Sequence, residues 1–273
     1  TPKFMQFTNN LNLGQYIPGD SLIHRLDPRC KIIGTLILLF GIFLITHPTC
    51  FLIWGALLLG ISRVAELPIA QVLRSSKPIW ILVLFTAFLH LFWTPGQTLV
   101  SIGFLHITQE GLLGAWTMGT RLLFLVIFAS ILMMTTSPMS FSDGLERLLS
   151  PLDRLGFPSQ EMAMMTTIAL RFIPTLLEET DRILKAQLSR GADFESGGII
   201  KRIRAFVPVL IPLFVQVFQR AENLAIAMES RCYQCGVVRS RLNPLVWNKG
   251  DSLVLLFLLF FVTAVSVMYS FLP

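Results

Sequence analysis

Long uncharged apolar stretches alternate with short polar segments along this chain, a pattern typical of helices that cross a membrane. No charged residue occurs from Ile32 to Ser62, and the polar turn Thr46-His47-Pro48-Thr49 divides that stretch into two expected spans. Three further spans are predicted at 78–93, at Gly111–Thr136 and from Ser252 onward. The pattern therefore predicts an all-α polytopic membrane protein with about five transmembrane helices.

The region between Ser137 and Lys249 has a different pattern, in which apolar residues recur at helical spacing beside charged ones. It predicts three long amphipathic helices at about Ser140–Leu155, Ser159–Arg190 and Ile199–Arg231. Proline removes a backbone donor, so we expect a bend or break in the second helix at Pro174 and in the third at Pro208 and Pro212. On the polar side of the second helix, ion pairs are predicted four residues apart for Glu178 with Arg182 and for Asp181 with Lys185.

The positions of Lys and Arg orient the predicted spans, because basic residues in short loops stay on the cytoplasmic side. Most of the 22 basic residues lie between Asp143 and Lys249, whereas the turn at 47–50 and the connector at 94–110 contain none. The N-terminus and the amphipathic region should thus be cytoplasmic and the C-terminus outside, and no cleavable signal peptide is needed. Four segments follow: a leader at 1–31, a four-span bundle at 32–136, a cytoplasmic helical domain at 137–249 and a last span at 250–273.

Composition narrows the possible functions. Hydrophobic residues make up 53% of the chain and charged residues 14%, and the net charge of +6 is spread among carboxylates, so nucleic-acid binding is not expected. The four cysteines suggest no disulfide framework. Cys232 and Cys235 form a Cys-x-x-Cys, but no second ligand pair is evident among Cys30, Cys50 and the histidines, so we predict no metal site.

Catalytic chemistry is also not indicated. The chain has no phosphate-binding G-x-x-x-x-G-K-[ST] loop and no clustered nucleophile, base or carboxylate pair, so it should be neither an ATPase nor another enzyme. A stand-alone secondary transporter or channel is the alternative, although Arg121 and His90 are nearly the only polar candidates within the spans. Arg121 either reaches an interface because its helix is shifted, which we favour, or faces protein or a water cavity.

A repeated tripeptide is the most specific feature. Ser189-Arg190-Gly191 recurs 41 residues later as Ser230-Arg231-Cys232, each at the end of a predicted amphipathic helix. One interpretation is helix capping, with Gly191 as the left-handed residue after the last turn. The other is that two equivalent arginines dock into two related partner subunits, where a guanidinium can bind carboxylates or carbonyls in a fork.

The tripeptides and the leader His24-Arg25-Leu26-Asp27-Pro28-Arg29 resemble the transmembrane T component of energy-coupling-factor (ECF) transporters, over nearly the whole chain. The resemblance implies a non-catalytic scaffold in a bacterial or archaeal cell membrane. Its partners would be two ABC-type ATPases, which would carry ATP and Mg, and a membrane S subunit that captures a vitamin or metal ion. This chain would hold no cofactor. Arg190 and Arg231 would each dock on one ATPase, and the leader would fix the first span to the long coupling helices.

Two further expectations follow from the resemblance. The family pattern is usually Ala-Arg-Gly, so with Cys232 in place of the last glycine the backbone after Arg231 is left open and the two docking sites need not be the same. The second expectation is a contact surface for the S subunit, although each of its residues could equally pack on this chain's own bundle. Its candidate residues are Met162, Met165, Phe172, Phe206, Phe214 and Phe218. The sequence does not specify the transported substrate.

Overall fold

The computed structural model describes residues 16–45, 47–102, 105–156, 158–194, 198–234 and 245–270. The chain divides into two compact units, with boundaries between Leu145 and Glu146 and between Pro244 and Leu245. We call the part before the first boundary, together with the part after the second, the membrane unit. The part between the boundaries is the α9–α10 unit. The leader from residue 16 and the last helix therefore belong to the same unit as the spans between them.

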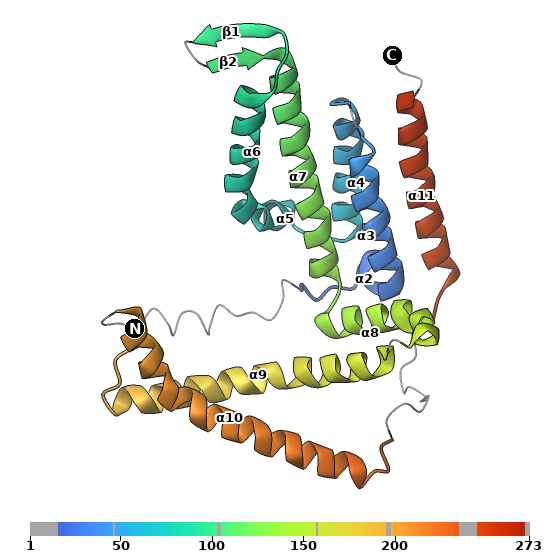
Figure 1. The fold of residues 1–273 in the computed structure, drawn as a ribbon. Coiled ribbons are helices and arrows are strands. Elements are labelled where there is room, and N and C mark those ends of the chain that lie inside the picture. The colour runs from blue at the N-terminus through green and yellow to red at the C-terminus, as the bar shows by residue number, and fades with distance from the viewer. Residues whose placement is uncertain are drawn as a thin grey trace. The chain divides into compact units, whose positions relative to one another are not determined.

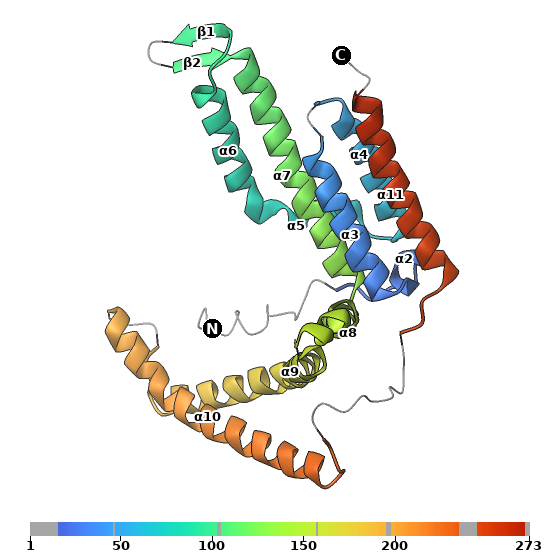
Figure 2. The same ribbon diagram turned by 45° about the vertical axis from the view of Figure 1, so that its right-hand side comes forward.

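Helix α7 is central in the membrane unit: it packs against α3, α4, α5 and α6, and α11 packs against α3 (Figures 1 and 2). The helices of this unit are α2 Leu22–Arg25, α3 Pro28–Phe43, α4 Cys50–Val64, α5 Ile69–Ser75, α6 Trp80–Trp93, α7 Gln109–Thr135, most of α8 Pro138–Leu149, and α11 Lys249–Ser270, with the 3-10 turn η1 Lys77–Ile79 between α5 and α6.

The predicted membrane-helical class is confirmed. Three helical stretches are long and apolar enough to cross a bilayer, at Ile69–Trp93, Gln109–Thr135 and Lys249–Met268. The third predicted span starts earlier than expected, because α5 and η1 continue into α6. The hairpin helices α3 and α4 have only 16 and 15 residues. At 1.5 Å per residue each is about 24 Å long, shorter than a hydrocarbon core of about 30 Å.

The connector between α6 and α7 departs from the predicted all-α architecture. Residues Thr98–Ile102 form β1 and Leu105–Thr108 form β2, an antiparallel pair in which Ile102 lies opposite Leu105. Valine, isoleucine and threonine favour extended backbone because their branched side chains fit a pleated strand. The short alternation of apolar and polar residues here went unrecognised in the sequence.

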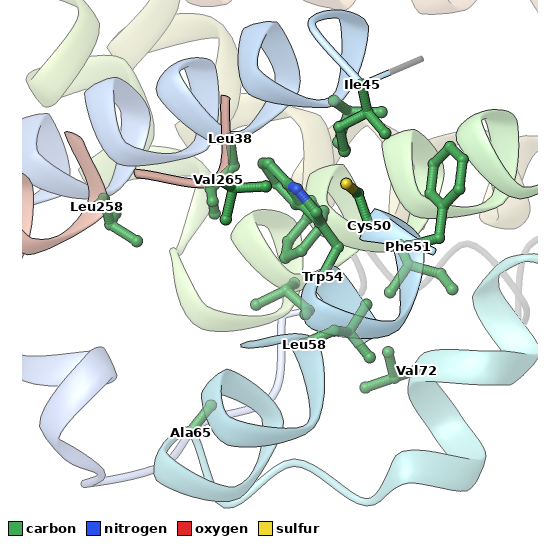
Figure 3. Close-up of a cluster of buried hydrophobic side chains, with 14 of the residues drawn as sticks. Leu38, Ile45, Cys50, Phe51, Trp54, Leu58, Ala65, Val72, Leu258 and Val265 are labelled. Carbon is green, nitrogen blue, oxygen red and sulfur yellow. The ribbon is translucent and has the colours of Figure 1, made fainter. Parts of the chain in front are cut away.

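Trp54 of α4 lies at the centre of the membrane unit's core (Figure 3). Its ring makes edge contacts with Phe128 of α7 and Phe261 of α11, at centroid distances of 5.8 Å in both cases. Gly41 of α3 permits this close packing, because an added Cβ would lie 2.9 Å from both Trp54 and Val262. One aromatic side chain thus joins α3, α4, α7 and α11.

The α9–α10 unit contains the two longest helices, α9 Ser159–Ser189 and α10 Ile199–Glu229, preceded by the 3-10 helix η2 Ser150–Leu155. The first predicted amphipathic helix is therefore α8 followed by η2. Pro174 lies inside α9, and Pro208 and Pro212 lie inside α10, yet both helices continue through these positions. A break at these positions is therefore excluded, whereas the alternative that we expected, a bend, stays a prediction.

Candidate interaction site at the ends of α9 and α10

The end of α9 is closed by two backbone hydrogen bonds. Gly191 N donates to Leu188 O at 3.0 Å, and Ala192 N donates to Gln187 O at 3.0 Å. This pair of bonds is the Schellman motif, which requires a left-handed residue after the helix. Gly191 has that conformation, with φ +84°.

The end of α10 has the same hydrogen-bond pattern. Cys232 N donates to Glu229 O at 2.9 Å, and Tyr233 N donates to Met228 O at 3.0 Å. Cys232 has φ +55°, so a side-chain-bearing residue occupies the position that Gly191 fills in α9. A left-handed conformation costs an L-residue roughly 1–2 kcal/mol. The backbone after Arg231, which the sequence left open, therefore matches the backbone after Arg190: the two tripeptides end their helices alike.

The serines and arginines of the tripeptides behave differently from one another. Ser189 Oγ donates to Lys185 O at 3.1 Å and Ser230 Oγ donates to Ala227 O at 3.0 Å, so both hydroxyls bond to their own helix. Arg190 and Arg231 are exposed, and neither guanidinium forms a hydrogen bond or ion pair within the described part of the chain. Because backbone donors already close both helix ends, neither guanidinium is needed as a cap.

An ion pair joins the two helices. Arg220 Nη2 of α10 donates to Glu179 Oε2 of α9 at 2.9 Å. The Gln216 amide, with its nitrogen turned toward α9, donates to Glu179 Oε1 at 2.8 Å. Of the two predicted pairs within α9, Asp181–Lys185 forms at 2.6 Å, whereas Glu178 and Arg182 form no ion pair with each other.

This ion pair has a symmetric place in the two helices. Glu179 and Arg220 are 41 residues apart, the same separation as Arg190 and Arg231. Each member therefore lies eleven residues before the arginine of its own helix, about 16 Å along the axis. The helices run in roughly opposite directions, so the two arginine ends point apart (Figures 1 and 2). Such ends can bind carboxylates or carbonyls on two separate surfaces.

Known proteins similar to this chain identify its family. The family CbiQ, described as cobalt transport protein, matches residues 19–242. This chain belongs to the CbiQ family. Similar proteins carry the name energy-coupling factor transporter transmembrane protein EcfT. The one from Thermanaerovibrio acidaminovorans is 57% identical over 247 residues, 90% of this chain and 92% of the relative. Those from Acidaminococcus fermentans and Bacillus subtilis are 48% and 41% identical, over 96% and 94% of this chain and 97% and 99% of theirs.

The resemblance seen in the sequence is thereby confirmed, and the CbiQ-family chain is a membrane component of an ECF transporter. Among its described residues there is no group of three or more His, Cys, Asp or Glu side chains able to hold a metal ion. Cys232 is exposed, while Cys235 lies outside the described residues.

The leader motif of this CbiQ-family chain contacts the spans of its own unit. Asp27 is the N-cap of α3, accepting from Arg29 N at 2.9 Å, and Pro28 takes the first helical position. The guanidinium of Arg29 donates to Leu245 O at 3.5 Å. His24 Nε2 donates to Ile17 O at 3.1 Å. In the neutral imidazole this leaves Nδ1 as the acceptor, and Ser21 Oγ donates to it at 2.6 Å. Arg25 is exposed.

The main partner of the leader is Asp251, which the sequence analysis missed. Asp251 is 1% exposed and its two carboxylate oxygens join two helix starts. Oδ2 accepts from Asn248 N at 2.8 Å at the start of α11, and Oδ1 accepts from Asp27 N at 3.0 Å at the start of α3. We expected the leader to fix the first span to the coupling helices. Pro28 does lie against Gly144 of α8, in the first of those expected helices, where an added Cβ would be 3.0 Å from Pro28 Cβ. The bonds of Asp251 additionally fix the leader to the last span. The spacing Asn248-x-x-Asp251 before an apolar run, a capping box, was the available signal.

Lys31 forms a second junction beside the leader. Its ammonium donates to Thr135 O at 3.0 Å, at the end of α7, and to His24 O at 2.9 Å. Burial lowers the pKa of Lys31 to about 8, and the nearby Cys30, Asp27 and Asp251 oppose that shift. Burial also raises the pKa of the Cys30 thiol to about 11. A desolvated cation therefore binds the carbonyls at the carboxyl end of α7.

Arg121 of α7 faces protein. Its guanidinium donates to Ile45 O, just beyond the end of α3, and lies 5.9 Å from the centroid of the Phe43 ring. A cation near the carboxyl end of a helix is stabilised by the helix dipole. This contact fits the alternative in which Arg121 faces protein, whereas the favoured shift of its helix toward an interface stays a prediction.

The predicted S-subunit surface is only partly accessible. Met162, Met165, Phe214 and Phe218 are exposed, whereas Phe172 is half-buried. Phe206 is also half-buried and packs on Phe194, with ring centroids 5.1 Å apart. The four exposed side chains are thus the ones in a position to contact another subunit.

Proposed function

We propose that this chain couples ATP hydrolysis by two ABC-type ATPases to uptake of a micronutrient, a vitamin or a metal ion, through a separate S subunit. The observation that carries the proposal is the pair of exposed guanidiniums of Arg190 and Arg231, which have no partner among the described residues and lie on helix ends with matching backbone geometry. Two like ends suit two related partners, and each arginine would dock on one ATPase. ATP and Mg would be bound by the ATPases and not by this chain.

The ion pair Glu179–Arg220 supports a mechanical role for α9 and α10. It holds together equivalent positions of the two helices, so a displacement of one arginine end is transmitted to the other helix. Closure of the ATPase dimer would move both ends. Rigid helices can carry that motion, because their packed side chains resist compression.

We propose that the exposed apolar residues of α9 and α10 pass this motion to the S subunit. Met165 and Phe218 are 64% and 70% exposed. Exposed apolar side chains are unfavourable on a surface that contacts only water, and they favour contact with another protein or a membrane. Methionine suits a surface that must fit alternative partners, since its side chain is flexible. The α9–α10 unit and the N-terminus would face the cytoplasm and the C-terminus the outside.

Copurification tests the docking. The double variant Arg190→Glu/Arg231→Glu should stay in the membrane and lose both ATPases. Each new carboxylate would be repelled by a partner site that is lined with acidic side chains or carbonyl oxygens. Arg182→Glu/Arg204→Glu is the matched control, since both arginines are exposed on the same helices away from their ends. Retention of two ATPases together with uptake in the first variant, or equal loss in the control, would contradict the proposal.

A further inference from the structure

An apolar groove of about 780 Å³ opens on the membrane unit between α4, α5 and α7. Its walls include Leu52, Ala56 and Leu59 of α4, Leu73 of α5, and Trp116 and Leu123 of α7. Its volume lies in the range of about 300–1,000 Å³ that is usual for small-ligand sites. Several of its side chains are open to the surroundings, with Leu52 78% and Trp116 62% exposed.

The groove has the length of one lipid leaflet. Its wall extends on α4 from Thr49 to Leu59 and on α7 from Trp116 to Ile127. These helical stretches measure about 15 and 16 Å at 1.5 Å per residue. Half of a hydrocarbon core of about 30 Å is also about 15 Å. An acyl chain of one leaflet can therefore lie along the groove from end to end.

Basic residues follow the groove-lining residues of α4 and α5 within one helical turn along the chain. The α4 face that carries Leu52, Ala56 and Leu59 continues by one more turn to Arg63, since these positions are three or four residues apart. Lys77 follows Leu73 by four residues. Arg74 adds a third cation on α5.

These three cations lack partners within the described residues. Arg63, Arg74 and Lys77 are exposed, and none of their side chains forms a hydrogen bond or ion pair there. The one acid in the loop, Glu66, is held in a left-handed turn at φ +55°; its backbone N–H donates to Arg63 O at 3.1 Å, but its carboxylate pairs with none of the three cations. The three cations thus place an uncompensated positive charge next to the residues that line the apolar groove.

We propose that this groove binds an anionic phospholipid, with an acyl chain along α4 and α7 and the phosphate among Arg63, Arg74 and Lys77. A transmembrane helix of a partner protein would cover the apolar walls but leave the three cations uncompensated. An anionic headgroup satisfies both features, because clusters of Lys and Arg at the membrane surface attract negatively charged lipids. The proposal does not depend on the coupling function.

Lipid retention tests this assignment. The detergent-purified full chain is incubated with phosphatidylglycerol or phosphatidylcholine, and bound lipid is counted by mass spectrometry. We expect preferential retention of phosphatidylglycerol, with a loss of about a hundredfold in Arg63→Gln/Arg74→Gln/Lys77→Gln, since each cation near the surface contributes about fivefold. Ala56→Trp, which fills the groove, should reduce retention of both lipids. Matched controls are Lys249→Gln and Leu256→Trp, an exposed cation and an exposed apolar residue of α11.

Three outcomes would overturn the proposal. The first is unchanged phosphatidylglycerol binding in the triple variant. The second is unchanged lipid binding in Ala56→Trp. The third is that Ala56→Trp loses a copurifying protein but retains lipid, which would make the groove a protein interface. Gel filtration checks that each variant is folded. Thr120→Trp, on the α7 wall, replaces Ala56→Trp if that variant aggregates.

Discussion

Glu179 and Arg220 form an ion pair of 2.9 Å between α9 and α10, and each lies eleven residues before the arginine at the end of its own helix. The carboxylate side chain is 16% exposed and the guanidinium 36% exposed, so the pair is only partly screened by water. This bridge fixes the relation between the two arginine ends within the α9–α10 unit. It is therefore the residue pair through which the ends would act together.

Breaking the bridge should uncouple transport more than it unfolds the protein. Glu179→Gln should reduce stability by about 1 kcal/mol, because a partly exposed ion pair contributes little, yet it should lower uptake several-fold at unchanged ATPase copurification. The exchange Glu179→Arg/Arg220→Glu restores the opposite charges and should restore uptake. Both are measured by vesicle uptake and thermal unfolding. Failure of the exchange to rescue, with intact folding, would mean that the bridge has no role in coupling.

The left-handed residues at the two helix ends predict opposite effects of glycine and alanine. Gly191→Ala should destabilise by about 1 kcal/mol, although nothing lies within 4 Å of the added Cβ, because of its φ of +84°. Cys232→Gly should stabilise by about the same amount. Thermal unfolding in detergent measures both, with Gly198→Ala as a control at an ordinary φ of −71°. Equal effects at positions 191 and 198 would contradict the shared cap.

Thiol reactivity should separate the exposed cysteine from the buried ones. In a Cys235→Ser background, maleimide at pH 8 should label Cys232 and leave Cys30 and Cys50 unlabelled, since both are buried and the pKa of Cys30 is about 11. Adding Cys232→Ser should abolish labelling. Mass spectrometry of the labelled peptides measures the result, and rapid labelling of Cys30 in folded protein would contradict its burial.

Removing Asp251 should loosen the junction between the first and last spans. Asp251→Ala leaves the buried backbone N–H of Asp27 and the part-buried backbone N–H of Asn248 without their acceptor. Each unsatisfied buried group costs about 1–3 kcal/mol, so the free energy of unfolding should fall by a few kcal/mol. Asp20→Ala, at an exposed leader position, is the control and should be nearly neutral. Denaturant unfolding compares the two variants. Similar small losses of stability in both would contradict the role of Asp251 in joining the two spans.

The pH dependence of stability should show two opposing contributions from the same junction. The pKa of Lys31 is lowered from 10.5 to about 8, so the unfolded state binds more protons between these values and the lysine contribution rises with pH. The pKa of Cys30 is raised from 9.0 to about 11, so its contribution falls as pH rises through that window. Cys30→Ala should therefore gain stability relative to wild type between pH 9 and 11. Adding Lys31→Met to Cys30→Ala should remove the rise of stability with pH that is due to the lysine. Unfolding midpoints at pH 8 and pH 10.5 measure both effects.

Much of the fold was evident in the sequence because membrane insertion depends on composition over long windows. The uncharged stretches predict the spans, and the amphipathic spacing predicts α9 and α10. Other features depend on distant neighbours. The helices continue through Pro174, Pro208 and Pro212, and β1 and β2 pair across a connector too short to show a clear period. Neither outcome is encoded in a local window.

By itself, the sequence determined the membrane class, the repeated arginines and their separation of 41 residues, since these depend on residue type and spacing alone. Only the tertiary structure decided what those residues contact. It paired Glu179 with Arg220, joined Asp27 to Asp251 across 224 positions, and gave Cys232 the conformation of Gly191. Long-range contacts and backbone dihedral angles follow from how the helices pack, because packing selects one partner among several that are chemically equivalent.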